Sequence, residues 1–158
     1  MGFENHSGLQ KKSKIMKTRS IFLTAAVTAL SMSSVFAQGK LEVIVKDIKE
    51  TKGNIRVGLF INEDSFLKEA AEGKVVKASG SQVTVRFENL KPGEYALSVI
   101  HDENENGELD SNVMGMPKEG FAFGNNAMGM FGPPSFEKAK LRIEDKKQVS
   151  QTITLKYL

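Results

Sequence analysis

The sequence predicts an all-β protein: an antiparallel β-sandwich of about seven strands with one short connecting helix and a long Gly/Phe-rich loop. Two observations support this fold class. Apolar and polar residues alternate over several short runs, which is the period of a strand with one buried face. Gly, Asn and Pro separate these runs, and these are the residues that tight turns require. No internal repeat or coiled-coil pattern competes with the prediction.

Residues 1–37 have the composition of a signal peptide. A basic cluster ending at Arg19 precedes an apolar run from Ile21 to Phe36, and Val35-Phe36-Ala37 resembles a signal-peptidase site. The run is shorter than the roughly 20 residues of a membrane span; a retained N-terminal anchor is the alternative. We therefore expect a signal peptide over residues 1–37 and a single domain over residues 38–158. The protein would be exported, periplasmic or extracellular, without a membrane span after cleavage.

Removal of the leader changes the charge of the chain. Five of the 22 Lys and Arg residues and one of the 19 acids lie in residues 1–37, which leaves 17 bases against 18 acids, a net charge of −1. The charge argument for a nucleic-acid partner is thereby lost. The chain has no cysteine, so core packing or a metal must stabilise the domain without disulfides, and a bacterial periplasm or exterior suits it.

The alternation places each strand. Leu41, Val43 and Val45 form the buried face of the first strand, and the second follows the turn-prone Lys52-Gly53-Asn54. A short strand is expected near Lys74 to Ala78. The predicted strands cover residues 41–46, 55–61, 74–78, 83–88, 95–101, 141–143 and 149–157.

Two connections have sequence signals of their own. Asp64 or Ser65 can cap a helix over residues 66–71 that Gly73 would end. In Leu90-Lys91-Pro92-Gly93-Glu94-Tyr95, proline followed by glycine predicts a type II turn. Tyr95 would then pack near a corner of the sheet.

The alternation stops between Ser111 and Glu137. This segment is rich in glycine and proline, and a loop of such length in a compact domain is usually functional or flexible. Its four phenylalanines predict that it is anchored on the sheet. They are Phe121, Phe123, Phe131 and Phe136.

An acidic segment just before this loop has the spacing of a calcium loop. Asp102, Asn104 and Asn106 occupy positions 1, 3 and 5, Gly107 occupies the sharp turn at position 6, and Asp110 occupies position 9. Glu108 would offer its backbone carbonyl at position 7. Five acids and no base between Asp102 and Asp110 favour a cation.

The segment also departs from an EF-hand. Position 12 is Val113 instead of a bidentate glutamate, and a strand precedes the loop. Glu119, Asn112 or water would have to complete the coordination. With neutral Asn at two positions, we expect weak calcium binding, with a Kd of about 10⁻⁴–10⁻³ M. An ion-free turn is the alternative, because Asn106-Gly107 is also a hairpin signal.

Two Met-Gly-Met pairs in the long loop suggest a second kind of metal chemistry. Met114 with Met116 and Met128 with Met130 provide soft thioethers suited to Cu(I), with His101 near the start of the loop. Methionine also fills gaps beneath flexible loops, which is the structural alternative.

The sequence favours a non-enzymatic role and leaves a small enzyme open. His101 is the one histidine after residue 37, and no Gly-x-Ser-x-Gly segment or convincing nucleophile accompanies it. The acids cluster in one loop, so the facing carboxylates of a glycosidase cannot be assigned.

Four motifs of the chain form one combined pattern: His101-Asp102-x-Asn104-x-Asn106-Gly107-x-Leu109-Asp110, Gly115-x-Pro117-x-Glu119-Gly120, Phe123-x-Asn125-Asn126 and Gly132-x-Pro134-x-Phe136. This pattern resembles a family of small exported bacterial proteins, the domain of unknown function 2141. The resemblance implies an exported transthyretin-like or immunoglobulin-like β-sandwich and carries no established activity. It also suggests that the acidic segment 102–110 and the long Gly/Phe-rich loop after it form one site.

We therefore expect a binding or structural module whose acidic loop is ordered by a cation. Its binding surface would be formed by His101, Phe121, Phe123, Asn125 and Asn126. The partner would be an envelope protein or a glycan. The alternative is a periplasmic copper-handling protein or small enzyme that uses His101 and the Met-rich loop.

Overall fold

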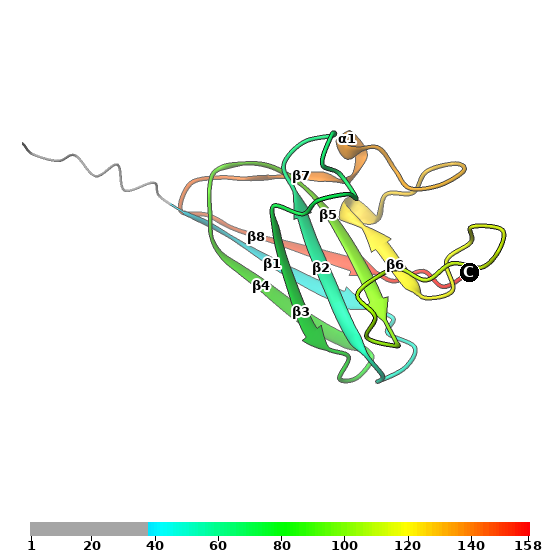
Figure 1. Cartoon of the computed structure of the whole chain (residues 1–158). Helices are drawn as coiled ribbons and strands as arrows, with labels where there is room; N and C mark the ends of the chain where they lie inside the picture. The colour runs from blue at the N-terminus through cyan, green and yellow to red at the C-terminus, as the bar shows by residue number, and fades with distance from the viewer. Residues whose placement is uncertain (1–37) are drawn as a thin grey trace, which may run out of the picture. The chain divides into compact units, whose positions relative to one another are not determined.

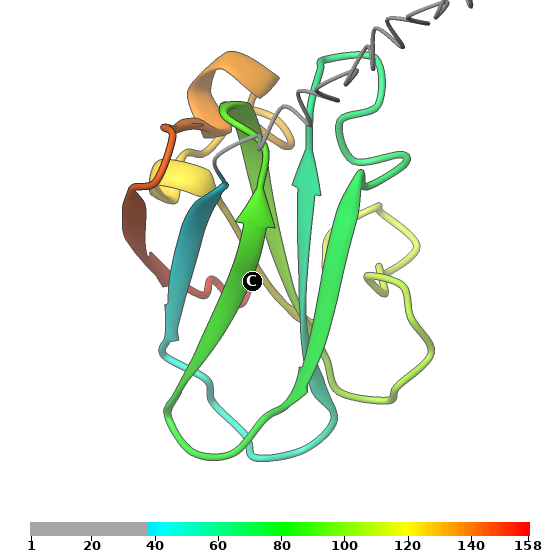
Figure 2. The same ribbon diagram turned by 90° about the vertical axis from the view of Figure 1, so that its left-hand side faces the viewer.

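The structure, a computed structural model, describes residues 38–158 and consists of two β-sheets packed together (Figures 1 and 2). The prediction of an all-β sandwich is confirmed. The signal peptide predicted for residues 1–37 lies outside the described residues.

The first sheet has three strands in the order β4-β1-β8. The strands are β1 (Gly39–Lys46), β4 (Gln82–Leu90) and β8 (Gln148–Thr154). β4 pairs with β1 antiparallel, whereas β8 pairs with β1 parallel. The sandwich is therefore antiparallel except at this one pair of the described strands.

The second sheet has five strands in the order β3-β2-β5-β6, and β7 also pairs with β5. The strands are β2 (Asn54–Phe60), β3 (Glu72–Lys77), β5 (Gly93–Asp102), β6 (Gly120–Phe123) and β7 (Lys140–Ile143). β5 is the longest strand of the domain and contacts three others. Its last two residues begin the candidate site.

Apolar side chains from both sheets form the main core. They include the fully buried Leu41, Val43, Phe87, Leu97 and Ile153. A second apolar cluster, called the aromatic cluster below, lies under the long loop. Its members are Phe60, Phe66, Ala96, Phe121, Phe123, Phe136 and Ala139.

Two local predictions are wrong. The segment 66–71 forms turns instead of a helix, because Leu67 adopts a left-handed φ of 59° and the buried ring of Phe66 packs into the aromatic cluster. The connection between β4 and β5 is not a type II turn, because Gly93 begins β5 and is not among the glycines with positive φ; the positive φ nearby, 63°, occurs at Asn89 within β4. The helix α1 (Phe136–Ala139) and the 3₁₀ turn Gly124–Asn126 follow β6 instead.

Tyr95 lies near the start of β5. Its side chain is 8% exposed and its hydroxyl donates a hydrogen bond of 2.9 Å to the carbonyl of Lys91. This bond ties the start of β5 to the connection that precedes it.

Candidate functional site: the acidic loop at the end of β5

The acidic segment forms the beginning of the loop that leaves the C-terminal end of β5 (Figure 1). At this end, Asp102 pairs in register with Asn54 and His101 with Ile55 of β2. Gly53, immediately before β2, adopts a φ of +71°, and a Cβ placed there would lie 2.1 Å from the carbonyl oxygen of Asp102. The turn between β1 and β2 thus packs directly against the start of the loop.

Asp102 anchors the loop from inside the domain. Its side chain is fully buried, and its two carboxylate oxygens accept hydrogen bonds from the backbone N–H groups of Asn106, at 3.0 Å, and Gly107, at 2.9 Å. Arg56 of β2 adds an ion pair, with Nη1 3.5 Å from Oδ2. Gly107 has a φ of +89°, which fits the sharp turn predicted at this position.

The other predicted ligands come together around Asp110. The side-chain amide of Asn104 donates to Asp110 Oδ2 at 2.6 Å, and that of Asn106 donates to Oδ1 at 3.2 Å. The amide oxygen of Asn104 accepts the N–H of Asn106, and that of Asn106 accepts the N–H of Glu108. The loop is therefore a compact turn held by hydrogen bonds among its own residues, although Asn104, Asn106 and Glu108 remain exposed.

Glu119 closes the loop at its base. Its side chain is buried, 5% exposed, and its two oxygens accept the N–H of Glu103 at 2.9 Å and of Asp110 at 3.0 Å. One carboxylate thus joins both ends of the acidic segment. This contact gives Glu119 a positioning role that its place in the sequence did not reveal.

Charge on the loop is only partly balanced. Arg56 pairs with Asp102, and Lys77 of β3 pairs with Glu105 at 2.6 Å. Within residues 38–158, no three His, Cys, Asp or Glu side chains are grouped as a set of metal ligands. The oxygens gathered here come instead from two aspartates and two asparagines, and Val113 at position 12 is fully exposed. An ion at this site would need backbone carbonyls or water to complete its coordination.

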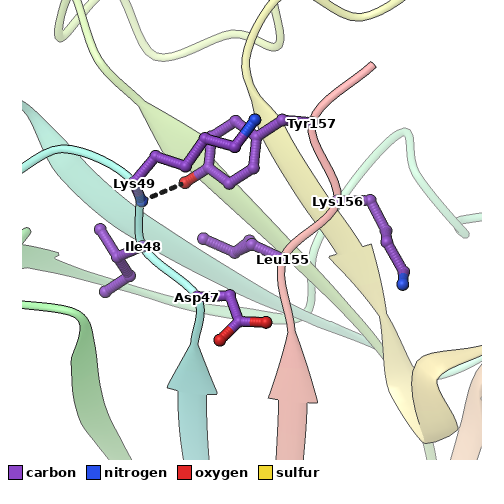
Figure 3. A pocket seen from close by; sticks show the side chains of 6 residues that line it. All are labelled: Asp47, Ile48, Lys49, Leu155, Lys156 and Tyr157. Carbon is purple, nitrogen blue, oxygen red and sulfur yellow. Dashed lines mark hydrogen bonds between the residues drawn. The ribbon is translucent and has the colours of Figure 1, made fainter.

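His101 is fully buried and held by two hydrogen bonds. Its Nε2 lies 2.8 Å from the carbonyl oxygen of Lys52, and its Nδ1 lies 2.8 Å from the hydroxyl of Tyr157. A carbonyl can only accept, so Nε2 carries a proton and a neutral ring accepts from Tyr157 at Nδ1. The same hydroxyl accepts the N–H of Lys49 at 3.2 Å, as Figure 3 shows.

Tyr157 also forms one wall of an open hollow of about 370 Å³ between the ends of β1 and β8 (Figure 3). Its lining residues are Asp47, Ile48, Lys49, Leu155, Lys156 and Tyr157. The Lys49 ammonium lies 4.5 Å from the centre of the Tyr157 ring. Burial is the main cause that raises the pKa of Tyr157, and the nearby Glu103, Glu50 and Asp47 carboxylates raise it further, against the lowering effect of the Lys49 N–H.

The predicted binding surface is wrong in three of its five residues. His101 is fully buried, and Phe121 and Phe123 are 6% and 7% exposed because their rings belong to the aromatic cluster. Asn125 and Asn126 are exposed, but both of their side chains are hydrogen-bonded. The Asn125 amide donates to the carbonyls of Lys138 and Lys140, and Asn126 bonds to the backbone of Thr152 and Thr154.

The four methionines of the copper alternative are exposed. Met114 and Met130 are 80% and 88% exposed, and Met116 and Met128 are 43% and 42% exposed. They are therefore not gap-fillers of the core. Copper binding stays a prediction.

Sequence reasoning missed Arg56 and Tyr157. Each acts through contacts with residues 46 and 56 positions away along the chain, which follow from the pairing of β2 with β5 and from the path of the C-terminal segment. In the sequence, Arg56 lies within the second predicted strand and Tyr157 at the end of the last one, and neither position indicates a contact with residues 101–102.

The family can now be stated. The family described as "Uncharacterized protein conserved in bacteria (DUF2141)" matches residues 43–151, which include the whole acidic loop and every strand except the first part of β1 and the last part of β8. The chain belongs to this family. No curated protein and no solved structure matches the chain significantly. Within residues 38–158, no helix is long and apolar enough to cross a membrane.

Proposed function

We propose that this family member is an exported, non-enzymatic binding module whose acidic loop is ordered by a hard cation of calcium type. One observation carries the proposal: Asn104, Asn106 and Asp110, predicted as ligands from their spacing alone, contact one another directly. The signal-like composition of residues 1–37 supports export.

The way in which the loop is held suits weak cation binding. Asp102 and Glu119 are buried and engaged with backbone N–H groups, so they fix the path of the chain without the ion. The carboxylate of Asp110 accepts hydrogen bonds from two neutral side-chain amides, those of Asn104 and Asn106, and its backbone N–H donates to Glu119. A divalent cation beside Asp110 would replace weak amide donors by a full charge, and the surrounding acids would favour it.

A non-enzymatic role is supported by the burial and the hydrogen bonds of His101. Both of its ring nitrogens are hydrogen-bonded inside the domain, to Lys52 and Tyr157. A buried, doubly bonded imidazole cannot reach a substrate without the departure of the C-terminal segment. We therefore assign His101 a structural role.

Calcium titration tests the proposal. We expect millimolar calcium to raise the thermal midpoint and to shift the amide signals of residues 102–110, with a half-effect at about 10⁻⁴–10⁻³ M. Asp110→Asn should abolish the response. Asp145→Asn, which changes an exposed acid in the turn between β7 and β8, should retain it. An unchanged midpoint and unchanged amide signals at millimolar calcium would exclude the cation.

The copper alternative has support in the exposure of the two Met-Gly-Met pairs, since exposed thioethers are accessible to an ion. A Cu(I) competition assay on the wild-type protein and on single and combined Met→Leu variants at positions 114, 116, 128 and 130 separates the two metals. Copper handling requires that these substitutions weaken Cu(I) binding while the calcium response persists.

A further inference from the structure

Two loop tips bear the most exposed large apolar side chains among residues 38–158. The first tip, residues 111–117, bears Val113 and Met114, which are 105% and 80% exposed. The second tip, residues 127–134, bears Met130 and Phe131, which are 88% and 97% exposed. Such values mean that these side chains project from the surface. Apolar side chains that are exposed in groups, unlike single ones, mark interaction sites.

Both tips are rooted in the same part of the fold. Leu109, just before the first tip, packs against the aromatic cluster. Phe123 and Phe136, which flank the second tip, belong to that cluster. In Figure 1 the two loops project beyond the sheets on the same side of the molecule.

The first tip is a tight turn. The side-chain oxygen of Asn112 accepts the N–H groups of Met114 at 2.9 Å and Met116 at 3.1 Å, and Ser111 forms a bridge with Pro117. The second tip folds closely on itself, since a Cβ at Gly129 would lie 2.4 Å from the carbonyl oxygen of Gly132. The projecting side chains are thus held by short, internally packed turns.

Neither tip carries a charge. No Asp, Glu, Lys or Arg occurs between Asp110 and Lys118, or between Glu119 and Glu137. Insertion of these residues into an apolar phase would therefore bury no ionised side chain. The free backbone groups of such turns would remain at the polar headgroup level.

We propose that the two tips insert shallowly into the surface of a lipid bilayer and dock the domain there. This proposal specifies the partner of the binding role given above and does not depend on its cation. Two separate projections fit a fluid surface, which adapts to any spacing, whereas a protein partner needs a complementary pocket for each.

The flanking charges indicate which bilayer is required. The first tip lies between one acid, Asp110, and one base, Lys118, and the second is followed by Glu137 and Lys138. No excess of positive charge attracts anionic headgroups. Apolar insertion is then the main attraction, so a zwitterionic bilayer suffices and salt has little effect.

A fluorescent label placed on the tips tests the proposal in the full chain. The chain has no cysteine, so Val113→Cys and Met130→Cys each provide one site for an environment-sensitive dye. Val75→Cys, at an exposed position of β3 that is 52% exposed, is the control. With phosphatidylcholine–phosphatidylethanolamine vesicles, we expect the emission of the dye at positions 113 and 130 to shift to shorter wavelength, in EDTA and in millimolar calcium alike. The dye at position 75 should not shift.

Phe131→Ser in the protein labelled at position 113 supplies a second measurement. Loss of the inserted ring should raise the vesicle concentration for half-maximal shift about tenfold. Because Phe131 is exposed, the unfolding midpoint should not change.

The outcomes are separable. Unshifted emission at positions 113 and 130, an equal shift at position 75, or no effect of Phe131→Ser would overturn the proposal. A shift that grows with protein concentration without vesicles would assign the tips to a second copy of the chain instead. Failure of the calcium titration alone would leave this proposal standing, since the expected shift also occurs in EDTA.

Discussion

The last two residues of β5, His101 and Asp102, are polar and fully buried, and every buried polar side-chain atom among residues 38–158 has a hydrogen-bond partner. His101 bonds to Lys52 and Tyr157, and Asp102 bonds to the loop that follows it. Buried polar groups are costly unless they are paired. These two residues therefore join the connection before β2, the C-terminal segment and the acidic loop at one point.

Asp102→Asn tests the anchoring role of the buried carboxylate. An amide has one acceptor oxygen, so one of the two N–H bonds from Asn106 and Gly107 is lost, together with the ion pair to Arg56. We expect the free energy of unfolding in urea to fall by about 1–3 kcal/mol. Asp145→Asn should change it by less than about 0.5 kcal/mol. Equal midpoints for both variants would contradict the role given to Asp102.

Tyr157→Phe should leave His101 Nδ1 and the Lys49 N–H without their partner. At neutral pH we expect a loss of about 1–3 kcal/mol in the free energy of unfolding, the cost of a buried group left unpaired. Tyr95→Phe, which removes the bond to the Lys91 carbonyl, is a comparison of the same chemistry in another corner of the sheet.

Tyr157 also predicts a dependence of stability on alkaline pH. Its pKa is raised in the folded protein, mainly by burial, so the folded state holds this proton more tightly than the unfolded state. The contribution is fully present below the ordinary pKa of 10.0 and is lost as pH rises through the folded pKa. In urea titrations between pH 8 and 11, wild type should therefore lose stability more steeply above pH 10.0 than Tyr157→Phe. Parallel curves would show that the hydroxyl has no such role.

At the scale of elements, alternation predicted the strands whose two faces differ. It missed β6, Gly120–Phe123, because all four residues of this strand are buried and no alternation exists to detect. It predicted a helix at residues 66–71, where the burial of Phe66 in the aromatic cluster outweighed local propensity. The same limit applies to the site: the spacing located Asp102, Asn104, Asn106 and Asp110, whereas Arg56 and Tyr157 depend on strand pairing that periodicity does not determine.

Gly53 makes the turn between β1 and β2 compatible with the acidic loop. Its φ is +71°, and a Cβ there would lie 2.1 Å from Asp102 O and 2.6 Å from Glu103 Cα. Gly53→Ala must displace one of these segments, so we expect a loss of more than about 2 kcal/mol in urea unfolding and altered amide signals across residues 102–110.

Gly80→Ala is the matched control for this prediction. Gly80 also has a positive φ, +111°, but nothing lies within 4 Å of the position of its Cβ. It should show only the backbone cost of about 1 kcal/mol and leave the acidic loop unchanged. If the two variants gave the same loss and the same spectra, contact with Asp102 would not be the cause.

At the scale of the whole molecule, the two apolar clusters stabilise different parts of the domain. The main core joins the sheets, and the aromatic cluster fixes the long loop that sequence patterns left without structure. Phe66 links Phe60, Phe123 and Phe136 through edge-to-face contacts with ring centres 5.4–6.5 Å apart. Because residues that flank both loop tips pack in this cluster, the position of the tips depends on core packing as well as on the acidic loop.

The charge of the whole molecule gives the last prediction. The full chain has a net charge of +3 and a pI of about 9.0, whereas residues 38–158 alone carry −1. If the leader is removed on export, mass spectrometry of the protein from the cell envelope should find Gln38 as its first residue. Isoelectric focusing should place the exported form well below the full chain, because five of the six charged groups removed are basic. A mature protein that retains Lys11 to Arg19 would keep the basic pI. It would then hold a cationic segment able to attract anionic lipid, so binding of the whole protein to anionic vesicles would depend on salt. The emission shift of the dye at positions 113 and 130 with zwitterionic vesicles would still be insensitive to salt.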